Sequence, residues 1–286
     1  MIQVAVIGVG LIGGSLGMAL RQVRIDGKRI FHVIGFNRSK KNNTLCLKRG
    51  AVDKISKQLR DGISLADVIV LAMPVDQIEP IMKKIVPWLK PGSITMDVGS
   101  VKSSIIKRSH IYFDKRPDLA FVGCHPMAGS EKTGVAHASA DLFKDATTII
   151  CNEKKKSKAL DLVKKIWQSV GSQVVFMGAE KHDELTAFTS HLPHLMSFSL
   201  FSVVNKIAKK NPLIKKLAAG SFRDMTRIAG SSATIWTSIF NQNKKNLLTA
   251  SSLLHRQINK ITHMPSHQIT KEIQKINLQK KKWIHN

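Results

Sequence analysis

The chain has 286 residues, of which 43% are hydrophobic and 22% are charged, and its 45 lysines and arginines exceed its 19 acidic residues to give a formal net charge of +26. This composition is typical of a globular protein with a sizeable core, and it excludes a disordered chain. No apolar stretch reaches the ~20 residues of a membrane span, and the three cysteines lack the CxxC spacing of a disulfide framework or a cysteine-built zinc site.

The positive charge is compatible with binding to nucleic acid or to an anionic membrane. The lysines are nevertheless spread along the chain, and the densest clusters, Lys154–Lys156 and Lys280–Lys282, contain few aromatic residues. We therefore favour a solvated basic surface that attracts small anions, with no membrane and no nucleic acid as partner. The opening MIQVAVIGVG lacks the basic region of a signal peptide. The odd number of cysteines without CxxC spacing predicts a reduced, cytoplasmic protein.

A short apolar run, Ile2–Ile7, predicts the first strand. It leads directly into a GxGxxG pattern that opens a helical run to Arg21. In this position the pattern is a dinucleotide-binding fingerprint, because glycines permit the tight turn, the close approach of the pyrophosphate and the packing of helix on strand. The amino end of the helix then offers free N–H groups to the phosphates. The candidate cofactor-binding residues here are Gly8, Gly10, Leu11, Ile12 and Gly13.

The second predicted strand, Ile30–Phe36, ends in Asn37, Arg38 and Ser39. A site that prefers NAD usually has Asp or Glu at this point to accept from the ribose 2′-hydroxyl. A neutral Asn37 does not repel a phosphate, and the following arginine and hydroxyl are suitable donors to one. The sequence therefore favours NADP over NAD, with the alternative that Arg38 only stacks on the adenine.

Strand and helix patterns alternate through the rest of the first 178 residues. The alternation predicts an α/β fold with an amino-terminal doubly wound Rossmann-type sheet that is mostly parallel. Met73 and Pro74 follow one apolar strand and are further candidate cofactor-binding residues. After another strand, Ser100 and Lys102 place a hydroxyl and an amine beside the same crevice. The predicted strands are 66–73, 93–97, 119–122, 147–151 and 173–177, and the predicted helices are 45–49, 75–89 and 159–170.

His125 follows the apolar run 119–122, in a stretch that we read as a loop of small residues with several glycines. The carboxyl ends of strands in α/β sheets are where such folds bind ligands. A histidine there, with an ordinary pKa near 6.5, is suited to accept a proton at neutral pH. The alternative is a loop histidine that is hydrogen-bonded for structural reasons.

From Glu180 onward the spacing predicts helices only. His191 and His194, three residues apart, made a metal site conceivable, but no third ligand has a suitable spacing, so we predict no metal. Farther along, Arg223 and Arg227 are four residues apart, which predicts that both lie on one helical face. Arginine binds carboxylates well because its planar fork reaches both oxygens.

Together these residues make the chain resemble the prephenate dehydrogenase family of tyrosine biosynthesis, which includes arogenate and cyclohexadienyl dehydrogenases. The resemblance covers nearly the whole chain through five motifs in the family's order: GVGLIGGSLG, DVGSVK, GCHPMAGSEKTG, SHLPH and FRDMTRIAG. It implies a dinucleotide-binding domain, residues 1–178, followed by an all-helical carboxyl-terminal domain, residues 179–286, that binds substrate and forms a homodimer.

The activity implied by the resemblance is NAD(P)-dependent oxidative decarboxylation of prephenate to 4-hydroxyphenylpyruvate, or of arogenate to tyrosine. His125 matches the family's catalytic histidine, and Ser100 matches the serine that orients this histidine and the substrate hydroxyl. His194 matches a histidine that contacts the substrate, and Arg227 matches the arginine that grips a substrate carboxylate, with Glu131 as its partner and gate. The remaining substrate-binding positions implied by the resemblance are His182 and Asp224.

Several points stay open at this stage. The second strand ends in Asn37 and Arg38 instead of the acidic residue that accounts for the family's frequent preference for NAD. The sequence also does not decide between prephenate and arogenate as substrate. We expect no appended regulatory or chorismate mutase domain, only a basic helical tail. One alternative is a dehydrogenase of β-hydroxyacid type, whose catalytic lysine would lie in the first helix of the helical domain. The stretch between Lys181 and Lys206 contains no lysine, which counts against this alternative. The other is a non-enzymatic protein that binds a cofactor or nucleic acid.

Overall fold

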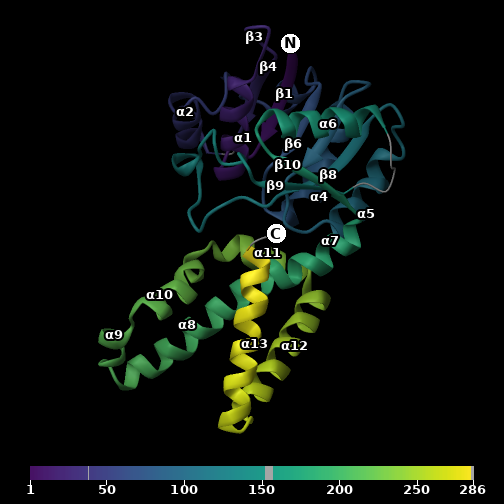
Figure 1. Ribbon diagram of the computed structural model, residues 1–286. Coiled ribbons are helices and arrows are strands. Elements are labelled where there is room, and N and C mark those ends of the chain that lie inside the picture. The colour runs from purple at the N-terminus through teal and green to yellow at the C-terminus, as the bar shows by residue number, and fades with distance from the viewer. Residues whose placement is uncertain (38, 152–156, 285–286) are drawn as a thin grey trace.

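The computed structural model of the protein describes residues 1–37, 39–151 and 157–284. An α/β part comes first, and a part made of helices follows and extends away from it (Figure 1). The last strand of the sheet ends at Met177 and helix α7 begins at Ala179. The predicted architecture, a doubly wound sheet followed by helices, is confirmed.

Within the described residues, eight strands form the main sheet in the order β10-β9-β8-β7-β6-β1-β4-β5. Neighbouring strands are parallel except β8 and β9, which are antiparallel. Crossovers that leave β1 in both directions give the doubly wound topology and put the carboxyl ends of the parallel strands along one edge. The strands are β1 Ile2–Ile7, β4 Phe31–Phe36, β5 Lys54–Ile55, β6 Val68–Leu71, β7 Ile94–Asp97, β8 Ala120–Pro126, β9 Thr147–Cys151 and β10 Gln173–Met177, and a separate hairpin pairs β2 Arg24–Ile25 with β3 Lys28–Arg29.

Helices cover both faces of this sheet. Helices α1, α2 and α6 pack on one face in a core that includes Leu16 and Trp167, and α3, α4 and α5 pack on the other in a core that includes Ile78 and Met82. Strand β6 is buried along its whole length, as expected for a central strand with helices on each side. The bounds are α1 Leu11–Gln22, α2 Lys40–Lys48, α3 Leu59–Ile63, α4 Val75–Ile85, α5 Ser103–Phe113 and α6 Lys158–Ser169.

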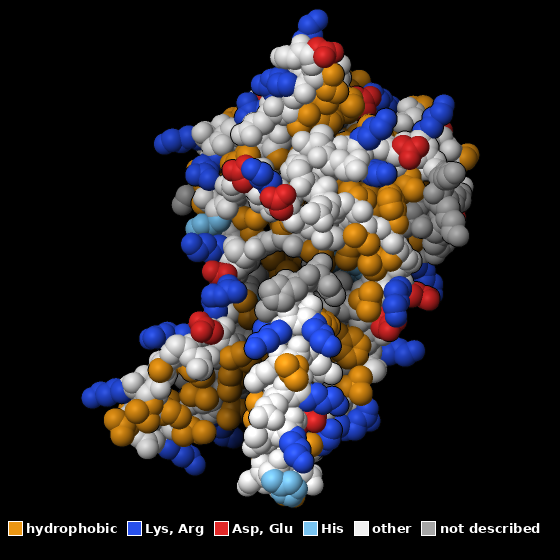
Figure 2. Space-filling view, viewed as in Figure 1, with side chains coloured by type: hydrophobic (Ala, Val, Ile, Leu, Met, Phe, Trp, Pro, Cys, Tyr) orange, Lys and Arg blue, Asp and Glu red, His pale blue; other side chains and the backbone are white. Residues whose placement is uncertain are grey.

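The described residues after Met177 contain helices and no strand, as predicted. Many apolar side chains on these helices are exposed, including Phe201 at 47%, Leu217 at 72% and Leu278 at 62%. Figure 2 shows hydrophobic side chains gathered over the α8–α9 end of this part. No helix among the described residues is long and apolar enough to cross a membrane. The bounds are α7 Ala179–Thr186, a π-helical turn Ala187–His191, α8 Leu192–Lys210, α9 Ile214–Leu217, α10 Gly220–Thr226, α11 Ala233–Gln242, α12 Lys244–Thr262 and α13 Ser266–Ile284.

His125 differs from the prediction, because it lies within strand β8 rather than in a loop after it. The strand continues because β9 runs antiparallel beside its outer end, where Gly123 pairs with Cys151 and Pro126 with Thr148. The glycine and the proline suggested a break, but a partner strand that arrives from later in the chain supplies the ladder.

Arg223 and Arg227 do not share one helical face, as the four-residue spacing had suggested. Helix α10 ends at Thr226, where the backbone leaves the helical region with φ −109° and ψ 1°, and Arg227 begins a short 3₁₀ turn. The two arginines are therefore separated by a change of backbone direction. Arg38, on which part of the cofactor prediction depends, lies outside the described residues.

Candidate active site

A cavity of about 570 Å³ lies between the carboxyl edge of the sheet and the helical part. This volume is typical of sites for small molecules and cofactors. The sheet part contributes the glycine turn, the end of β6 and the end of β8, and the helical part contributes α8, α11 and the 3₁₀ turn at Arg227. The cavity thus joins most of the predicted site residues, namely Gly10, Leu11, Ile12, Met73, Pro74, Ser100, His125, Glu131, His194 and Arg227.

The glycine turn is shaped for a dinucleotide. Gly8 has a φ of +96°, and a Cβ there would lie 2.3 Å from the carbonyl oxygen of Ala72. A Cβ on Gly13 would lie 2.3 Å from the carbonyl oxygen of Gly8, so helix α1 depends on this glycine to pack against the strand. A Cβ on Gly10, by contrast, would meet no atom within 4 Å. The open space at Gly10 and the helix end that no side chain caps fit a pyrophosphate.

Asn37 contacts the glycine turn. The N–H of Val9 donates to Asn37 Oδ1 at 2.8 Å, and Asn37 Nδ2 donates to Cys46 Sγ at 3.3 Å. The carboxamide oxygen therefore holds the turn in place, and no acidic side chain occupies position 37. Ser39 is exposed at the amino end of α2.

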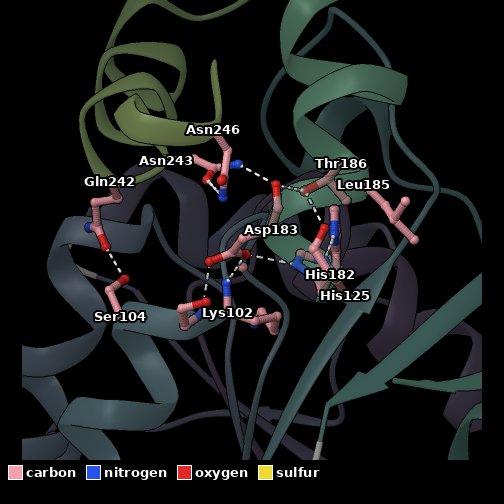
Figure 3. A network of polar contacts seen from close by, with 12 residues as sticks. Lys102, Ser104, His125, His182, Asp183, Leu185, Thr186, Gln242, Asn243 and Asn246 are labelled. Atoms are coloured by element: carbon pink, nitrogen blue, oxygen red, sulfur yellow. Dashed lines mark hydrogen bonds and ion pairs between the residues drawn. The ribbon is translucent and has the colours of Figure 1, made fainter. Parts of the chain in front are cut away.

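Three buried side chains form a hydrogen-bonded series behind the cavity (Figure 3). His125 Nδ1 lies 2.8 Å from His182 Nε2, and His182 Nδ1 lies 2.8 Å from Asp183 Oδ1. The exposed fractions are 7% for His125, 0% for His182 and 3% for Asp183. Only His125 faces the cavity, so the predicted substrate-binding residue His182 lies behind the base instead.

An ion pair is buried next to this series. Lys102 Nζ bonds to Asp97 Oδ2 and also donates to the carbonyl oxygen of Cys124 at 2.8 Å, and both charged side chains are fully buried. Gly99 N–H donates to the same carboxylate oxygen at 2.8 Å. The pair fixes the loop after β7 against the backbone of β8 one residue before His125.

Burial sets the protonation of these groups. Burial, together with the nearby His182 and the cation of Lys102, holds the pKa of His125 well below its usual range. Burial likewise lowers the pKa of His182, although its hydrogen bond to Asp183 opposes that change. His125 is thus neutral at pH 7, which is the form that can accept a proton.

Residues from the helical part form the opposite wall. The His194 ring stacks on Trp236 with ring centroids 3.5 Å apart, and its Nδ1 lies 3.0 Å from the carbonyl oxygen of Ser190. Arg227 Nη1 donates to Glu131 Oε2 at 2.8 Å, which joins the 3₁₀ turn to the loop after β8. The cavity therefore offers a cation, an imidazole and an aromatic face opposite the base.

Asp224 is exposed and does not line the cavity, so the structure does not bring this predicted residue to the site. His191 and His194 also diverge, because His191 is buried and bonds to Asn243 at 3.0 Å while His194 faces the cavity. Among the described residues, no group of three or more His, Cys, Asp or Glu is placed to hold a metal ion.

Three residues that complete the site had been given no role by sequence reasoning, namely Asp183, Asn243 and Trp236. Only Asp183 had a signal, its position next to His182 in a segment otherwise read as plain helix.

Two family models together match most of the chain. The model described as the prephenate dehydrogenase nucleotide-binding domain matches residues 18–176, and the one described as the prephenate dehydrogenase dimerization domain matches residues 178–278. The chain is 33% identical to the prephenate dehydrogenase of Lactococcus lactis over 84% of this chain and 65% of that protein. It is 35% identical to the prephenate dehydrogenase of Bacillus subtilis over 89% of this chain and 67% of that protein. The match thus spans about two thirds of the length of these relatives.

Solved structures give the same result over the whole fold. A prephenate dehydrogenase from Aquifex aeolicus, in complex with hydroxyphenyl propionate and NAD⁺, superposes with a TM-score of 0.87 at 29% identity, over 99% of this chain and 98% of that one. An arogenate dehydrogenase from Synechocystis superposes with a TM-score of 0.79 at 26% identity, over 99% of this chain and 100% of that one.

Proposed function

Because the chain belongs to the prephenate dehydrogenase family, we propose that it catalyses the NAD(P)-dependent oxidative decarboxylation of prephenate, or of arogenate, in tyrosine biosynthesis. The observation that carries this proposal is the cavity itself, which places a buried neutral histidine between a dinucleotide turn and an arginine. Such a site suits a substrate that carries both a hydroxyl group to be oxidised and carboxylates to be held.

The cofactor would be held along the glycine turn, where the open space at Gly10 and the uncapped amino end of α1 would receive its pyrophosphate. When bound, it would accept a hydride from the ring carbon that bears the hydroxyl. The residues of this chain that would hold it are Gly8, Gly10, Leu11, Ile12, Gly13, Met73 and Pro74.

His125 acts as the general base. Its Nε2 takes the proton of the substrate hydroxyl while the hydride leaves the ring carbon that bears this hydroxyl. The bond to the ring carboxylate breaks, carbon dioxide leaves, and the electron pair of that bond completes the aromatic ring. The protonated His125 then returns the proton to the ring oxygen, so that the product carries a phenol hydroxyl. Ser100, in the cavity wall near the base, orients the hydroxyl group. A base with a pKa below neutrality takes the proton without first having to lose one.

The helical part holds the substrate. Arg227 binds a carboxylate through its planar fork, and Glu131 positions that arginine. His194, oriented by its stack on Trp236, contacts the substrate side chain. His182 is not a substrate contact in this proposal, because it is fully buried behind His125.

Turnover of prephenate and of arogenate, each with NAD and with NADP, tests the function. We expect 4-hydroxyphenylpyruvate or tyrosine to form, together with the reduced cofactor, in at least one of the four assays. Absence of turnover in all four, with a cofactor-loaded and folded protein, contradicts the proposal.

We also propose that NADP is used at least as well as NAD. Asn37 supports this, because position 37 has no negative charge to repel a 2′-phosphate and its oxygen already accepts from Val9. Dissociation constants for both cofactors at one salt concentration test the choice, with Arg38→Ala expected to narrow the difference. A tenfold or greater preference of the wild type for NAD contradicts it.

Finally, we propose that residues 1–178 bind the dinucleotide and that residues 179–286 bind substrate and form a homodimer. The exposed apolar side chains of α8, α9 and α13 support this, because apolar surface of this kind is typically covered by a partner. Sedimentation equilibrium of the full chain should give a mass of about twice 31.7 kDa. A monomer at micromolar concentration contradicts it.

A further inference from the structure

We propose that Asp183 is a positioning residue that acts through His182 to keep Nε2 of His125 unprotonated and available to the substrate. This inference rests on the proposed function of His125 as the base. It concerns which of two ring nitrogens carries the proton of a neutral imidazole, a choice that decides whether the base can work at all.

The series of bonds has one fixed end. Asp183 Oδ1 accepts from His182 Nδ1 at 2.8 Å and from the backbone N–H of Lys102 at 2.7 Å, and Oδ2 accepts from the N–H of Ser103 at 2.9 Å. Burial raises the pKa of Asp183, but these donors outweigh that effect and lower it overall. The carboxylate is therefore ionised at neutral pH and can only accept.

The direction of the remaining bonds follows from that end. Because Asp183 only accepts, His182 must carry its proton on Nδ1, and a neutral His182 then has a lone pair on Nε2. That lone pair faces His125 Nδ1 at 2.8 Å, so His125 must donate from Nδ1. The lone pair of His125 is left on Nε2, the ring nitrogen that does not contact His182, and of these two histidines only His125 lines the cavity.

Without Asp183 the series is symmetric in energy to a first approximation. His182 could equally carry its proton on Nε2 and donate to His125 Nδ1, which would place the proton of His125 on Nε2. In that arrangement the base presents a donor to the substrate and cannot accept the hydroxyl proton. The carboxylate therefore selects the productive arrangement of the two.

The backbone around Asp183 keeps the carboxylate in place. Two of its three donors are backbone N–H groups at the start of α5, in the sheet part, while Asp183 itself belongs to α7. Asn243 Nδ2 donates to the carbonyl oxygen of Asp183 at 2.7 Å from the start of α12 (Figure 3). The side chain of Asp183 is thus anchored to the sheet part, and its backbone is anchored to the helical part.

The first experiment is carried out on the wild-type protein. Two-dimensional ¹H–¹⁵N correlation spectra of the ¹⁵N-histidine-labelled protein, saturated with cofactor, report the protonation of each ring nitrogen. His125→Asn and His182→Asn serve only to assign the signals. We expect protonated Nδ1 and unprotonated Nε2 for both histidines at pH 7.5. A protonated Nε2 on His125 overturns the proposal, whether or not the protein turns over prephenate.

The second experiment compares two replacements of Asp183. Asp183→Leu removes every acceptor, and we expect kcat to fall on the order of 10²-fold or more while the KM for substrate changes less than about threefold. Asp183→Asn keeps one carbonyl oxygen, which the two donors Lys102 N–H and His182 Nδ1–H hold on the His182 side. We therefore expect this conservative variant to recover much of the lost kcat and to keep the wild-type histidine spectrum.

Thr186→Val is the matched control. It removes a buried hydrogen bond from Thr186 Oγ1 to the carbonyl oxygen of His182, at 2.8 Å, without altering the series of ring bonds. We expect its melting temperature to fall but its kcat and histidine spectrum to stay close to wild type. A kcat of Asp183→Leu within about threefold of wild type overturns the proposal. If Asp183→Leu does not fold, an Asp183→Asn protein that keeps the wild-type histidine spectrum but loses kcat on the order of 10²-fold overturns the proposal, because that loss would not act through the tautomer. If the wild type turns over neither substrate, the proposed function fails, and the spectra still decide the tautomer.

Discussion

Replacing Lys102 by methionine should destabilise the protein strongly. The side chains of Lys102 and Asp97 are both fully buried, and the ammonium group also bonds to the carbonyl oxygen of Cys124. The variant leaves a buried carboxylate without its cation and a buried carbonyl without its donor. Removing one partner of a buried pair typically costs about 3–5 kcal/mol of the free energy of unfolding, and we expect a loss of that size at pH 7.

The loss should depend on pH in a defined direction. Burial already raises the pKa of Asp97 despite the attraction of Lys102, and without that cation it rises further. A group whose pKa is raised on folding loses its contribution as the pH rises, so the variant should be more destabilised at pH 8 than at pH 5, by up to about 1.4 kcal/mol per pH unit.

Urea denaturation, followed by far-ultraviolet circular dichroism, measures the free energy of unfolding of Lys102→Met and of the wild type. Lys107→Met is the control, because Lys107 is an exposed lysine on helix α5, which begins directly after Lys102, and this variant should stay within about 0.5 kcal/mol of wild type. The double variant Asp97→Asn/Lys102→Met should recover part of the loss, because it contains no ionisable group to leave unpaired. A Lys102→Met protein within 1 kcal/mol of wild type at pH 8 would show the reasoning to be wrong.

Three further outcomes are expected. His125→Asn should keep the cofactor dissociation constant but lower kcat by roughly 10²–10⁴-fold, and near-full turnover would reduce this histidine to a structural role. Arg227→Ala should raise the KM for prephenate by about tenfold rather than more, because the arginine side chain is 64% exposed and water screens its charge, and an unchanged KM would move the carboxylate contact elsewhere. Burial lowers the pKa of His191 from 6.5 to about 4, so its contribution to stability is complete above pH 6.5 and is lost as the pH falls toward 4. Urea denaturation at a series of pH values should therefore show that the wild type loses about 3 kcal/mol of its free energy of unfolding over that range and that His191→Gln lacks this loss. An equal dependence of the free energy of unfolding on pH in the two proteins would contradict this assignment.

The fold was predictable because its signals are local. The strands Ile2–Ile7, Thr147–Cys151 and Gln173–Met177 have the bounds that their largely apolar runs indicate. The glycine turn was equally predictable, because Gly8 and Gly13 are required by backbone atoms close to them and Gly10 leaves space for a ligand.

The inner part of the site was not predictable, because it depends on contacts between distant segments. Asp183 meets the amino end of α5 across 81 residues of chain, and His125 meets His182 across 57. No spacing rule reaches that far. The same applies to His125, which the sequence left in a loop because nothing near it announces the strand that pairs with it.

The antiparallel strand β9 also determines which part of the site can move. The end of β8 is paired with β9 as far as Met127, whose N–H donates to the carbonyl oxygen of Thr147 at 2.7 Å. The backbone of His125 therefore cannot open without breaking the ladder between β8 and β9. The backbone amide hydrogen of His125 should therefore exchange with solvent only on global unfolding. The segment 128–134 that follows has exposed and half-buried residues only, so slow motions that admit and release substrate belong there. Libraries aimed at a new substrate range should diversify this segment and keep 123–126 constant.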